Sequence, residues 1–182
     1  MKRFLAGLLT AALAAGLLAP AAGAAEPGFS DVPANGALAD EVAKAVDYGL
    51  MGGYNATTFG YSDPMTRAQF AAVLVRMMGW DTVTPQTPSY SDVPASLGWY
   101  GAIETAAAHD VADTGGSFRP GDAVTRGEMA EMLVRALGLK SAAERLAPTA
   151  SDQYARIHGG TPFTDLPGDK VGYITIAYTI GM

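Results

Sequence analysis

The phrase "MTRAQF" (65–70) has a near-copy, "VTRGEM" (124–129), further along the chain, and this recurrence is the main clue to the fold. In each copy a threonine stands three residues before a glutamine or a glutamate, directly ahead of an apolar run. This arrangement is typical of a capping box, in which the two side chains satisfy free N–H groups at the start of a helix. The predicted structural caps pair Thr66 with Gln69 and Thr125 with Glu128.

An apolar stripe follows each predicted cap at positions i, i+3, i+4, i+7 and i+8, and Gly79 or Gly138 ends the run. This spacing predicts one apolar face on each helix, and we expect both faces to lie on a shared core. The stripes consist of Phe70, Val73, Leu74, Met77 and Met78 in the first copy, and of Met129, Met132, Leu133, Ala136 and Leu137 in the second.

A second phrase occurs three times, as "FSDVP" (29–33), "YSDVP" (90–94) and "FTDLP" (163–167). Apolar residues at helical spacing follow the first two copies and predict further helices at 37–50 and 99–111. The order of the phrases is the same in both units, which indicates an internal repeat.

The phrases together predict an all-α fold of repeated helix–loop–helix units. The chain divides into two complete units at 29–80 and 90–139, a truncated third at 163–182, and linkers at 81–89 and 140–162. We expect a short helix around 142–146 in the second linker. The third unit lacks its loop and second helix, so its apolar face must pack on the other repeats, on another chain, or on sequence outside this one.

The N-terminus, residues 1–24, has the features of a signal peptide. Lys2 and Arg3 precede an apolar run, and small residues up to Ala24 offer a cleavage site. The run of about 16 residues is shorter than the roughly 20 that span a bilayer. We therefore expect an exported protein with no membrane segment after cleavage.

The composition narrows the class of partner. Without residues 1–24, ten basic residues face eighteen acidic ones, which makes the formal net charge −8 and predicts no nucleic-acid partner. The chain has no cysteine, so no disulfide stabilises it. The absence of disulfides in an exported protein favours the bacterial envelope as its location.

Two arginines, Arg67 and Arg126, follow the capping threonines at the first helical position, where a positive charge is unfavourable by about 0.3–1 kcal/mol. Their recurrence suggests a purpose, since free N–H groups and a guanidinium together bind carboxylates or phosphates well. A salt bridge to Asp63 or Asp122 is the structural alternative. On the ligand hypothesis, replacing both arginines by alanine should leave folding nearly intact while binding falls.

Other candidate ligand residues are the aspartates of the opening phrases, Asp31, Asp92 and Asp165, and the indole of Trp99. The carboxylates either brace the turn or accept hydrogen bonds from sugar hydroxyls. The indole either packs or stacks on a sugar ring.

These phrases resemble the S-layer homology (SLH) domain: aromatic-SDV, a helix ending at glycine, a loop with F-x-P, and TR-[AG]-[EQ] before an apolar helix. The resemblance covers about 29–80, 90–139 and the first half of a third unit at 163–182. It implies a pseudo-threefold helical bundle, here with its third unit incomplete. It also implies non-covalent anchoring of a secreted protein to bacterial secondary cell-wall polysaccharide, often pyruvylated, at the cell wall or S-layer.

In the family, the arginine of the TR phrase is associated with ligand grooves between the repeats. The resemblance therefore implies this ligand-binding role for Arg67 and Arg126. The aspartate of the family's SDV phrase corresponds to Asp31, Asp92 and Asp165. The aromatic residue of its first helix corresponds to Trp99. The first repeat departs from the pattern, since Leu38 stands where the second has Trp99 and Gln69 stands where it has Glu128.

Other functions remain open. Paired carboxylates such as Asp92 and Glu104 would serve a wall hydrolase, although no nucleophile motif or metal-ligand spacing occurs and His109 and His158 are isolated. We therefore expect no enzyme activity, no cofactor and no metal. The truncated unit could instead dock another SLH chain, which leaves self-association open, or the chain could be a fragment of a larger surface protein.

Overall fold

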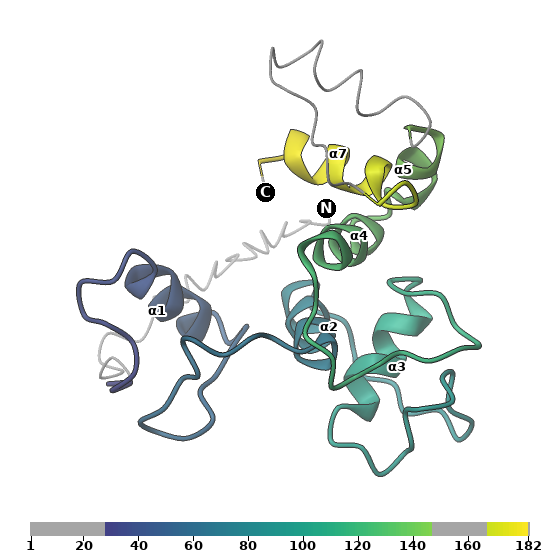
Figure 1. Cartoon of the computed structure of the whole chain (residues 1–182). Coiled ribbons are helices and arrows are strands. Elements are labelled where there is room, and N and C mark those ends of the chain that lie inside the picture. The colour runs from purple at the N-terminus through teal and green to yellow at the C-terminus, as the bar shows by residue number, and fades with distance from the viewer. Residues whose placement is uncertain (1–27, 147–166, 182) are drawn as a thin grey trace, which may run out of the picture.

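The computed structural model describes residues 28–146 and 167–181, so the predicted signal peptide and Asp165 lie outside the described residues. Within these ranges the chain forms six helices and no strand, which confirms the all-α prediction (Figure 1). The helices are α1 (Ala39–Asp47), α2 (Arg67–Met77), α3 (Tyr100–Ala108), α4 (Arg126–Ala136), α5 (Lys140–Leu146) and α7 (Val171–Thr179). No helix in the described part of the chain is long and apolar enough to cross a membrane.

The first helices of the two complete units, α1 and α3, end in the same way, a few residues before the predicted limits. After α1, Gly49 takes a positive φ of 66°, and the amide of Leu50 donates to the carbonyl of Ala45. After α3, Asp110 takes the same slot with φ 55°. This is a Schellman-type end, which satisfies the last carbonyls of a helix and turns the chain toward its loop.

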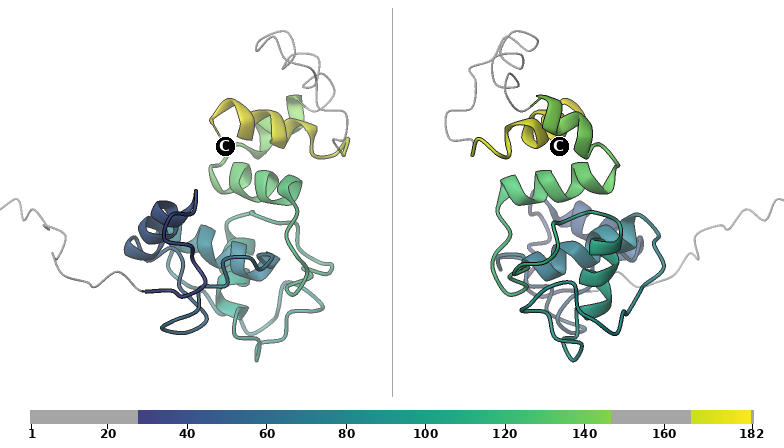
Figure 2. Two further views of the ribbon diagram at one scale, coloured as in Figure 1. Left: turned by 60° about the vertical axis from the view of Figure 1, so that its left-hand side comes forward. Right: turned by 90° about the vertical axis from the view of Figure 1, so that its right-hand side faces the viewer.

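Helices pair across the units rather than within them. The second helix of the first unit, α2, packs on α3 of the second unit, and α4 packs on α7, which lies in the segment predicted as a third unit. The predicted helix in the second linker is present as α5, and it packs mainly on α7. Figure 2 shows α5 and α7 on one side of α4, with α2 and α3 on the other.

The core consists of two apolar clusters that meet at α4. Met132 and Ala136 face the larger cluster around α2 and α3, whereas Ala130 and Val134 face the smaller one with Tyr173 of α7. The prediction of a single apolar face on this helix was therefore wrong for α4. Because α4 lies between two layers, more than one of its faces is buried.

The stripe of α2 differs from the prediction for the same reason. Phe70 and Leu74 are buried as expected, but Met77 is exposed, and Ala71 and Val75 are buried instead. Since α2 contacts both α3 and α4, its burial follows the two neighbours rather than one stripe.

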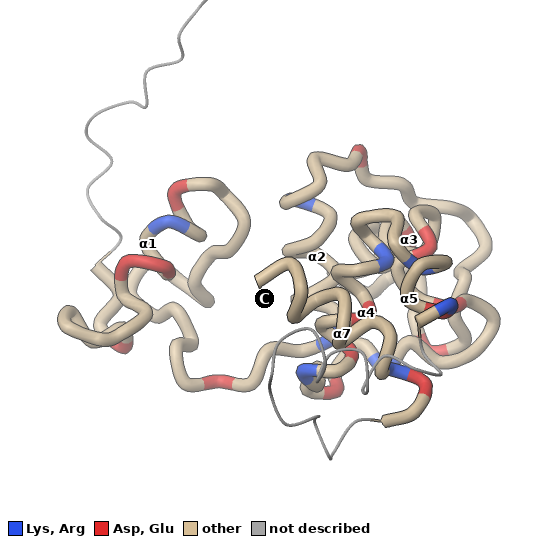
Figure 3. Tube along the Cα trace, turned by 90° about the horizontal axis from the view of Figure 1, so that it is seen from above, with Lys and Arg blue, Asp and Glu red and all other residues tan. Residues whose placement is uncertain are grey.

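Helix α1 stands apart from this arrangement (Figures 1 and 3). None of its residues is buried, and neither apolar cluster includes it. The segment that the sequence analysis predicts as a third unit has the opposite outcome, because α7 packs closely on α4 and α5. The apolar face of α7 therefore packs on other parts of this chain.

Candidate ligand grooves between the repeats

Both predicted capping boxes are present. The Thr66 hydroxyl accepts from the amide of Gln69 at 3.2 Å, and the Gln69 side chain accepts from the Thr66 amide at 2.8 Å. Thr125 and Glu128 make the same two bonds, at 3.2 and 2.9 Å. These residues fix where α2 and α4 begin, and so fix the position of the arginine that follows each cap.

The aspartates of the SDV phrases brace the loops of their own units. Asp31 accepts from the amides of Phe59, Gly60 and Tyr61 at 2.7–3.0 Å. These bonds lower the pKa of Asp31, and the bond from Phe59 has the largest effect on it. The carboxylate thus holds the loop of the first unit closed over its opening turn.

Asp92 does the same in the second unit, where it accepts from the amides of Phe118 and Arg119 at 2.7 Å each. Burial disfavours its charge, but these bonds and the nearby Arg67 outweigh burial and lower the pKa of Asp92. Since backbone amides engage both oxygens, the structure places this carboxylate in the bracing role that the sequence left open.

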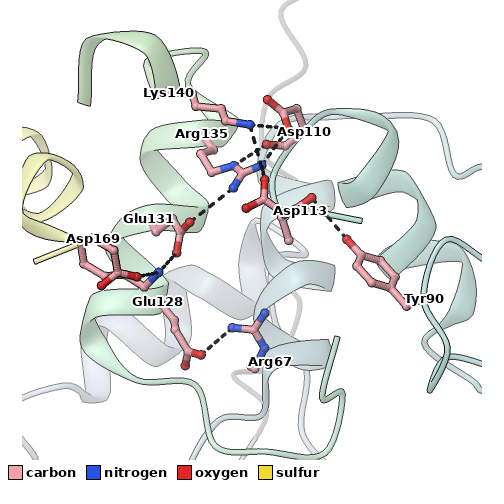
Figure 4. Close-up of polar contacts among 11 residues, drawn as sticks. Arg67, Tyr90, Asp110, Asp113, Glu128, Glu131, Arg135, Lys140 and Asp169 are labelled. Atoms are coloured by element: carbon pink, nitrogen blue, oxygen red, sulfur yellow. Dashed lines mark hydrogen bonds and ion pairs between the residues drawn. The ribbon is translucent and has the colours of Figure 1, made fainter. Parts of the chain in front are cut away.

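Arg67 reaches out of its own repeat into the next one. Its Nε donates to the carbonyl of Phe118 at 2.7 Å, and its guanidinium carbon lies 4.9 Å from the centre of the Phe118 ring. Its Nη1 lies 2.9 Å from Oε1 of Glu128 (Figure 4). The side chain is 11% exposed and is held by the following unit on three sides.

The salt bridge considered from the sequence therefore exists, but with a different partner. Neither Asp63 nor the carboxylate of Asp122 pairs with Arg67. Asp122 contributes its backbone carbonyl, which accepts from the Arg67 amide at 2.9 Å. The carboxylate that pairs with the guanidinium is the capping residue of the next unit.

Glu128 has two functions that the sequence did not connect. Its Oε2 caps its own helix through Thr125, while its Oε1 accepts from both Arg67 and Arg119. Burial raises its pKa, but the Thr125 bonds and the two arginines outweigh burial, so the pKa of Glu128 lies below its ordinary value.

Arg126, the counterpart of Arg67, is in a different environment. It is exposed, and no hydrogen bond or ion pair holds its side chain among the residues that the structure describes. Two similar phrases thus place one arginine inside a junction and the other on the surface.

The first groove, of about 390 Å³, lies between the loop of the first unit, α2 and the start of α3. Trp99 is the N-cap residue of α3, is 37% exposed and lines this groove. The polar and aromatic lining comprises Tyr54, Phe59, Tyr61, Asp63, Gln69, Arg76 and Trp99. An exposed aromatic ring beside a cation and hydrogen-bonding groups suits a charged sugar.

The second groove, of about 180 Å³, lies at the equivalent place in the second unit, between its loop, α4 and the start of α7. Lys170, the N-cap residue of α7, takes the place that Trp99 has in the first groove. The charged lining comprises Arg67, Asp113, Arg119, Glu128, Glu131 and Lys170. Three cations meet there, which the sequence analysis did not foresee for Arg119 and Lys170.

Like Arg67, the other two cations are themselves paired with carboxylates. Burial disfavours the charge on Lys170, but Glu131 at 2.6 Å and Asp169 at 3.1 Å outweigh it and raise the pKa of Lys170. Arg119 takes a positive φ of 60°, and its side chain contacts Glu128. The "FRP" phrase was a usable signal for Arg119, because it marks the loop that forms the groove wall.

A cluster of charges near the second groove joins the second unit to α5. Arg135 of α4, whose side chain is 1% exposed, pairs with Asp110 at 2.7 Å and Asp113 at 2.8 Å, and Lys140 of α5 pairs with the same two carboxylates (Figure 4). Burial opposes the charge of Arg135, yet the hydrogen bonds to the two aspartates raise its pKa. The cluster is structural, since each of its charges is paired.

The carboxylates proposed for a hydrolase, Asp92 and Glu104, are both engaged. Glu104 is buried and accepts from the amide and the hydroxyl of Ser89 at 2.9 and 2.6 Å. A shallow depression of about 500 Å³ lies beside Glu104. Because Ser89 uses both oxygens of Glu104 and loop amides use both of Asp92, this pair holds loops in place.

The sequence profile of the S-layer homology domain matches residues 28–71 and 89–130. The chain carries two S-layer homology domains. The matched regions contain the first two SDV turns, α1, α3 and the starts of α2 and α4, and they include much of the lining of both grooves, whereas Arg76, Glu131 and Lys170 lie outside them.

Similar proteins include an S-layer protein of Bacillus thuringiensis subsp. finitimus, 32% identical over 76% of this chain and 17% of the relative. A surface layer protein of Brevibacillus choshinensis is 30% identical over 82% of this chain and 14% of the relative. An endoglucanase of Bacillus sp. (strain KSM-635) is 33% identical over 59% of this chain and 11% of the relative. The chain spans less than a fifth of each of these proteins. The SLH match and the surface-protein relatives together support a cell-wall anchoring module at the bacterial surface.

Proposed function

We propose that this chain attaches non-covalently to a carboxylate-bearing secondary cell-wall polysaccharide, in particular a pyruvylated one, through the two grooves between its SLH units. The observation that carries this proposal is the pair of equivalent clefts, of which the first is lined by one cation, Arg76, and the second by three. An acidic chain can bind an acidic polymer only where such local positive charges gather.

In the first groove, Trp99 and Tyr54 offer aromatic faces for a sugar ring, and Arg76 offers the cation. Arg76 donates one bond to the carbonyl of Leu50 at 3.0 Å, which orients its guanidinium without neutralising it. The hydrogen bond to Asp63 raises the pKa of Tyr54 and uses the one proton of its phenol, so Tyr54 offers a ligand its ring face and an acceptor oxygen.

In the second groove, Arg67, Arg119 and Lys170 stand around Glu128 and Glu131. The two glutamates neutralise part of the charge of these cations, and this groove is the smaller of the two. It therefore suits a smaller acidic group than the first groove does. Asp31 and Asp92 support the proposal indirectly, because they hold the loops that form the walls. We assign no ligand contact to Arg126 in either groove, since it lines neither.

Binding to purified cell-wall sacculi tests the proposal. The purified protein should sediment with untreated sacculi and should lose most of that binding after chemical removal of pyruvate. Equal binding to both preparations would exclude the pyruvate ketal as the recognised group.

Variants locate the site. Trp99→Ala and Arg76→Ala should each weaken binding by about tenfold. Tyr48→Ala and Arg145→Ala are the matched controls, because they remove an exposed aromatic ring and an exposed arginine that line neither groove. Loss of binding in the controls alone would overturn the groove assignment.

We propose no catalytic role. The similarity to the endoglucanase covers 11% of that protein, and the two carboxylates considered for hydrolysis hold loops through both oxygens. Release of sugars from sacculi by the purified chain would contradict this.

A further inference from the structure

The buried carboxylate of Glu104 has no counterion. The side chains of Glu128 and Glu131, which are 12% and 18% exposed, each pair with a lysine or an arginine. Glu104 is only 2% exposed, yet its partners are the amide and the hydroxyl of Ser89, which are neutral donors. Within residues 28–146 and 167–181 no lysine or arginine forms an ion pair with it. Because a buried charge without a counterion is unfavourable, this site favours a cation from outside.

The negative charge of Glu104 acts on the groups around it. Burial, and after it the charge of Glu104, raise the pKa of Tyr90 to about 12. The same two causes raise the pKa of Tyr100. The chain as a whole is acidic, so its long-range field also attracts cations rather than anions.

A second, independent observation is that Glu104 lines the shallow depression of about 500 Å³ between α3 and the segment 83–89. Its other lining residues are apolar or carry hydroxyl groups, and no lysine or arginine is among them. The apolar ones are Val83, Pro85, Ala107 and Ala108, and the hydroxyl groups belong to Thr84, Ser89 and Thr114. The depression therefore offers one carboxylate, apolar walls and several hydroxyls.

The segment 83–89 is fixed to α3, so the depression is formed before a ligand arrives. The amide of Val83 donates to the hydroxyl of Thr105 at 2.9 Å, and the hydroxyl of Tyr100 donates to the carbonyl of Pro85 at 2.5 Å. Ser89 uses one acceptor position on each oxygen of Glu104. Each carboxylate oxygen accepts two hydrogen bonds, so each keeps one for a ligand.

These features together indicate one ligand chemistry. An ammonium group supplies the missing positive charge and up to three donors. The carbon–hydrogen face of a sugar ring suits the apolar walls, and its hydroxyls suit Thr84 and Thr114. The volume lies in the range of pockets that hold whole small molecules, which favours a ring over a single aliphatic chain.

We propose that this depression binds an amino sugar whose amine is free and protonated, such as a unit of a wall glycan that lacks its N-acetyl group. The ammonium lies at Glu104, and the ring lies against Ala107 and Ala108. The depression shares no lining residue with either groove, so this site does not rest on the binding of an acidic polymer there.

The probe is glucosamine, added to the isotope-labelled protein slightly below neutral pH, where a sugar amine carries its proton. The amide resonances of Val83, Ser89 and Ala108 should shift in a saturable manner. N-acetylglucosamine, which has the same ring without the charge, should bind about tenfold more weakly, because it lacks the charge-assisted hydrogen bond.

Two variants locate the site. Glu104→Gln keeps an oxygen acceptor for the Ser89 amide and should weaken glucosamine binding about tenfold. Ala108→Leu leaves Glu104 in place and fills the depression from the exposed end of α3, so it should weaken the binding of both sugars. Glu144→Gln and Ala95→Leu are the matched controls, because they make the same changes at exposed positions that line neither the depression nor a groove.

Circular dichroism establishes that each variant is folded, and Ala108→Leu carries the test alone if Glu104→Gln is not. Trp99→Ala should bind glucosamine like the unchanged protein, which separates the depression from the first groove. Equal binding of the two sugars, or unchanged binding in the variants of the depression, would overturn the proposal. Nα-acetyl-lysine amide carries the same ammonium on a linear chain. If it bound more tightly than glucosamine, the site would belong to lysine side chains and the amino-sugar assignment would be wrong.

Discussion

The guanidinium of Arg67 and the carboxylate of Glu128 lie 2.9 Å apart and join the second helices of two successive SLH units. Each belongs to a TR phrase, and each has a local function as well, at the start of α2 or as the cap of α4. The pair therefore couples the start of one helix to the cap of another.

This pair changes the effect expected for the two arginines. Arg67→Ala removes one partner of a largely buried ion pair and should destabilise the protein by about 3 kcal/mol. Arg126→Ala, at an exposed position, should change stability by less than about 0.5 kcal/mol. Urea denaturation followed by circular dichroism measures both. Equal midpoints for the two variants would show that the junction does not contribute to stability.

Substitutions at Glu128 separate the ion pair from the cap. Glu128→Gln keeps a capping side chain of the kind found at Gln69, so it should lose only the charge interaction, about 1–2 kcal/mol. Glu128→Ala should lose a further ~1 kcal/mol with the cap. The reciprocal change Gln69→Glu is the control. If Glu128→Gln and Glu128→Ala unfolded at the same urea concentration, the cap would have no separate effect.

Acidification should destabilise the protein through its carboxylates. The pKa values of Glu128 and Asp92 are lower in the folded protein than their ordinary values of 4.5 and 3.8, so the unfolded chain takes up protons first. Their contribution is complete above the ordinary values and is lost as the pH falls through the folded-state values. The urea midpoint should therefore fall as the pH drops from about 5 to about 3.

The Glu128→Gln variant provides the control for this pH profile. With one of the responsible carboxylates removed, its midpoint should fall less steeply over the same range. A steeper fall in the variant would assign the acid sensitivity to other groups.

The contact between α5 and α7 depends on Gly172. A Cβ at this position would overlap the carbonyl of Ala143, so Gly172→Ala should destabilise the α5–α7 pair by about 1–3 kcal/mol. Gly127→Ala is the matched control in α4, where a Cβ would meet only ordinary contacts, and should stabilise by about 0.5–1 kcal/mol. Hydrogen exchange of the α7 amides measures the difference, and faster exchange in the Gly127 variant would contradict the assignment.

The helix starts could be predicted from the sequence because capping is local: Thr66 and Gln69 need only each other. The burial of Arg67 and the exposure of Arg126 could not be predicted, because the two phrases are alike and the surroundings of each arginine come from the following unit. The same reason explains why Met77 is exposed and Val75 is buried, since the side of α2 that is buried depends on α3 and α4. Trp99 was placed in a groove by its resemblance to the family, whereas Arg119 and Lys170 join theirs only once the loop and α7 are in position.

The pairing of α2 with α3 and of α4 with α7 means that the repeating segment of sequence and the unit that folds are offset by half a repeat. A deletion series or a domain graft cut in the 81–89 segment would separate helices that pack together. Cuts in the loops that follow α1 and α3 would keep each packed pair whole. Fragments bounded by those loops are the ones we expect to fold cooperatively, and truncation studies that follow the sequence repeat should yield less stable pieces.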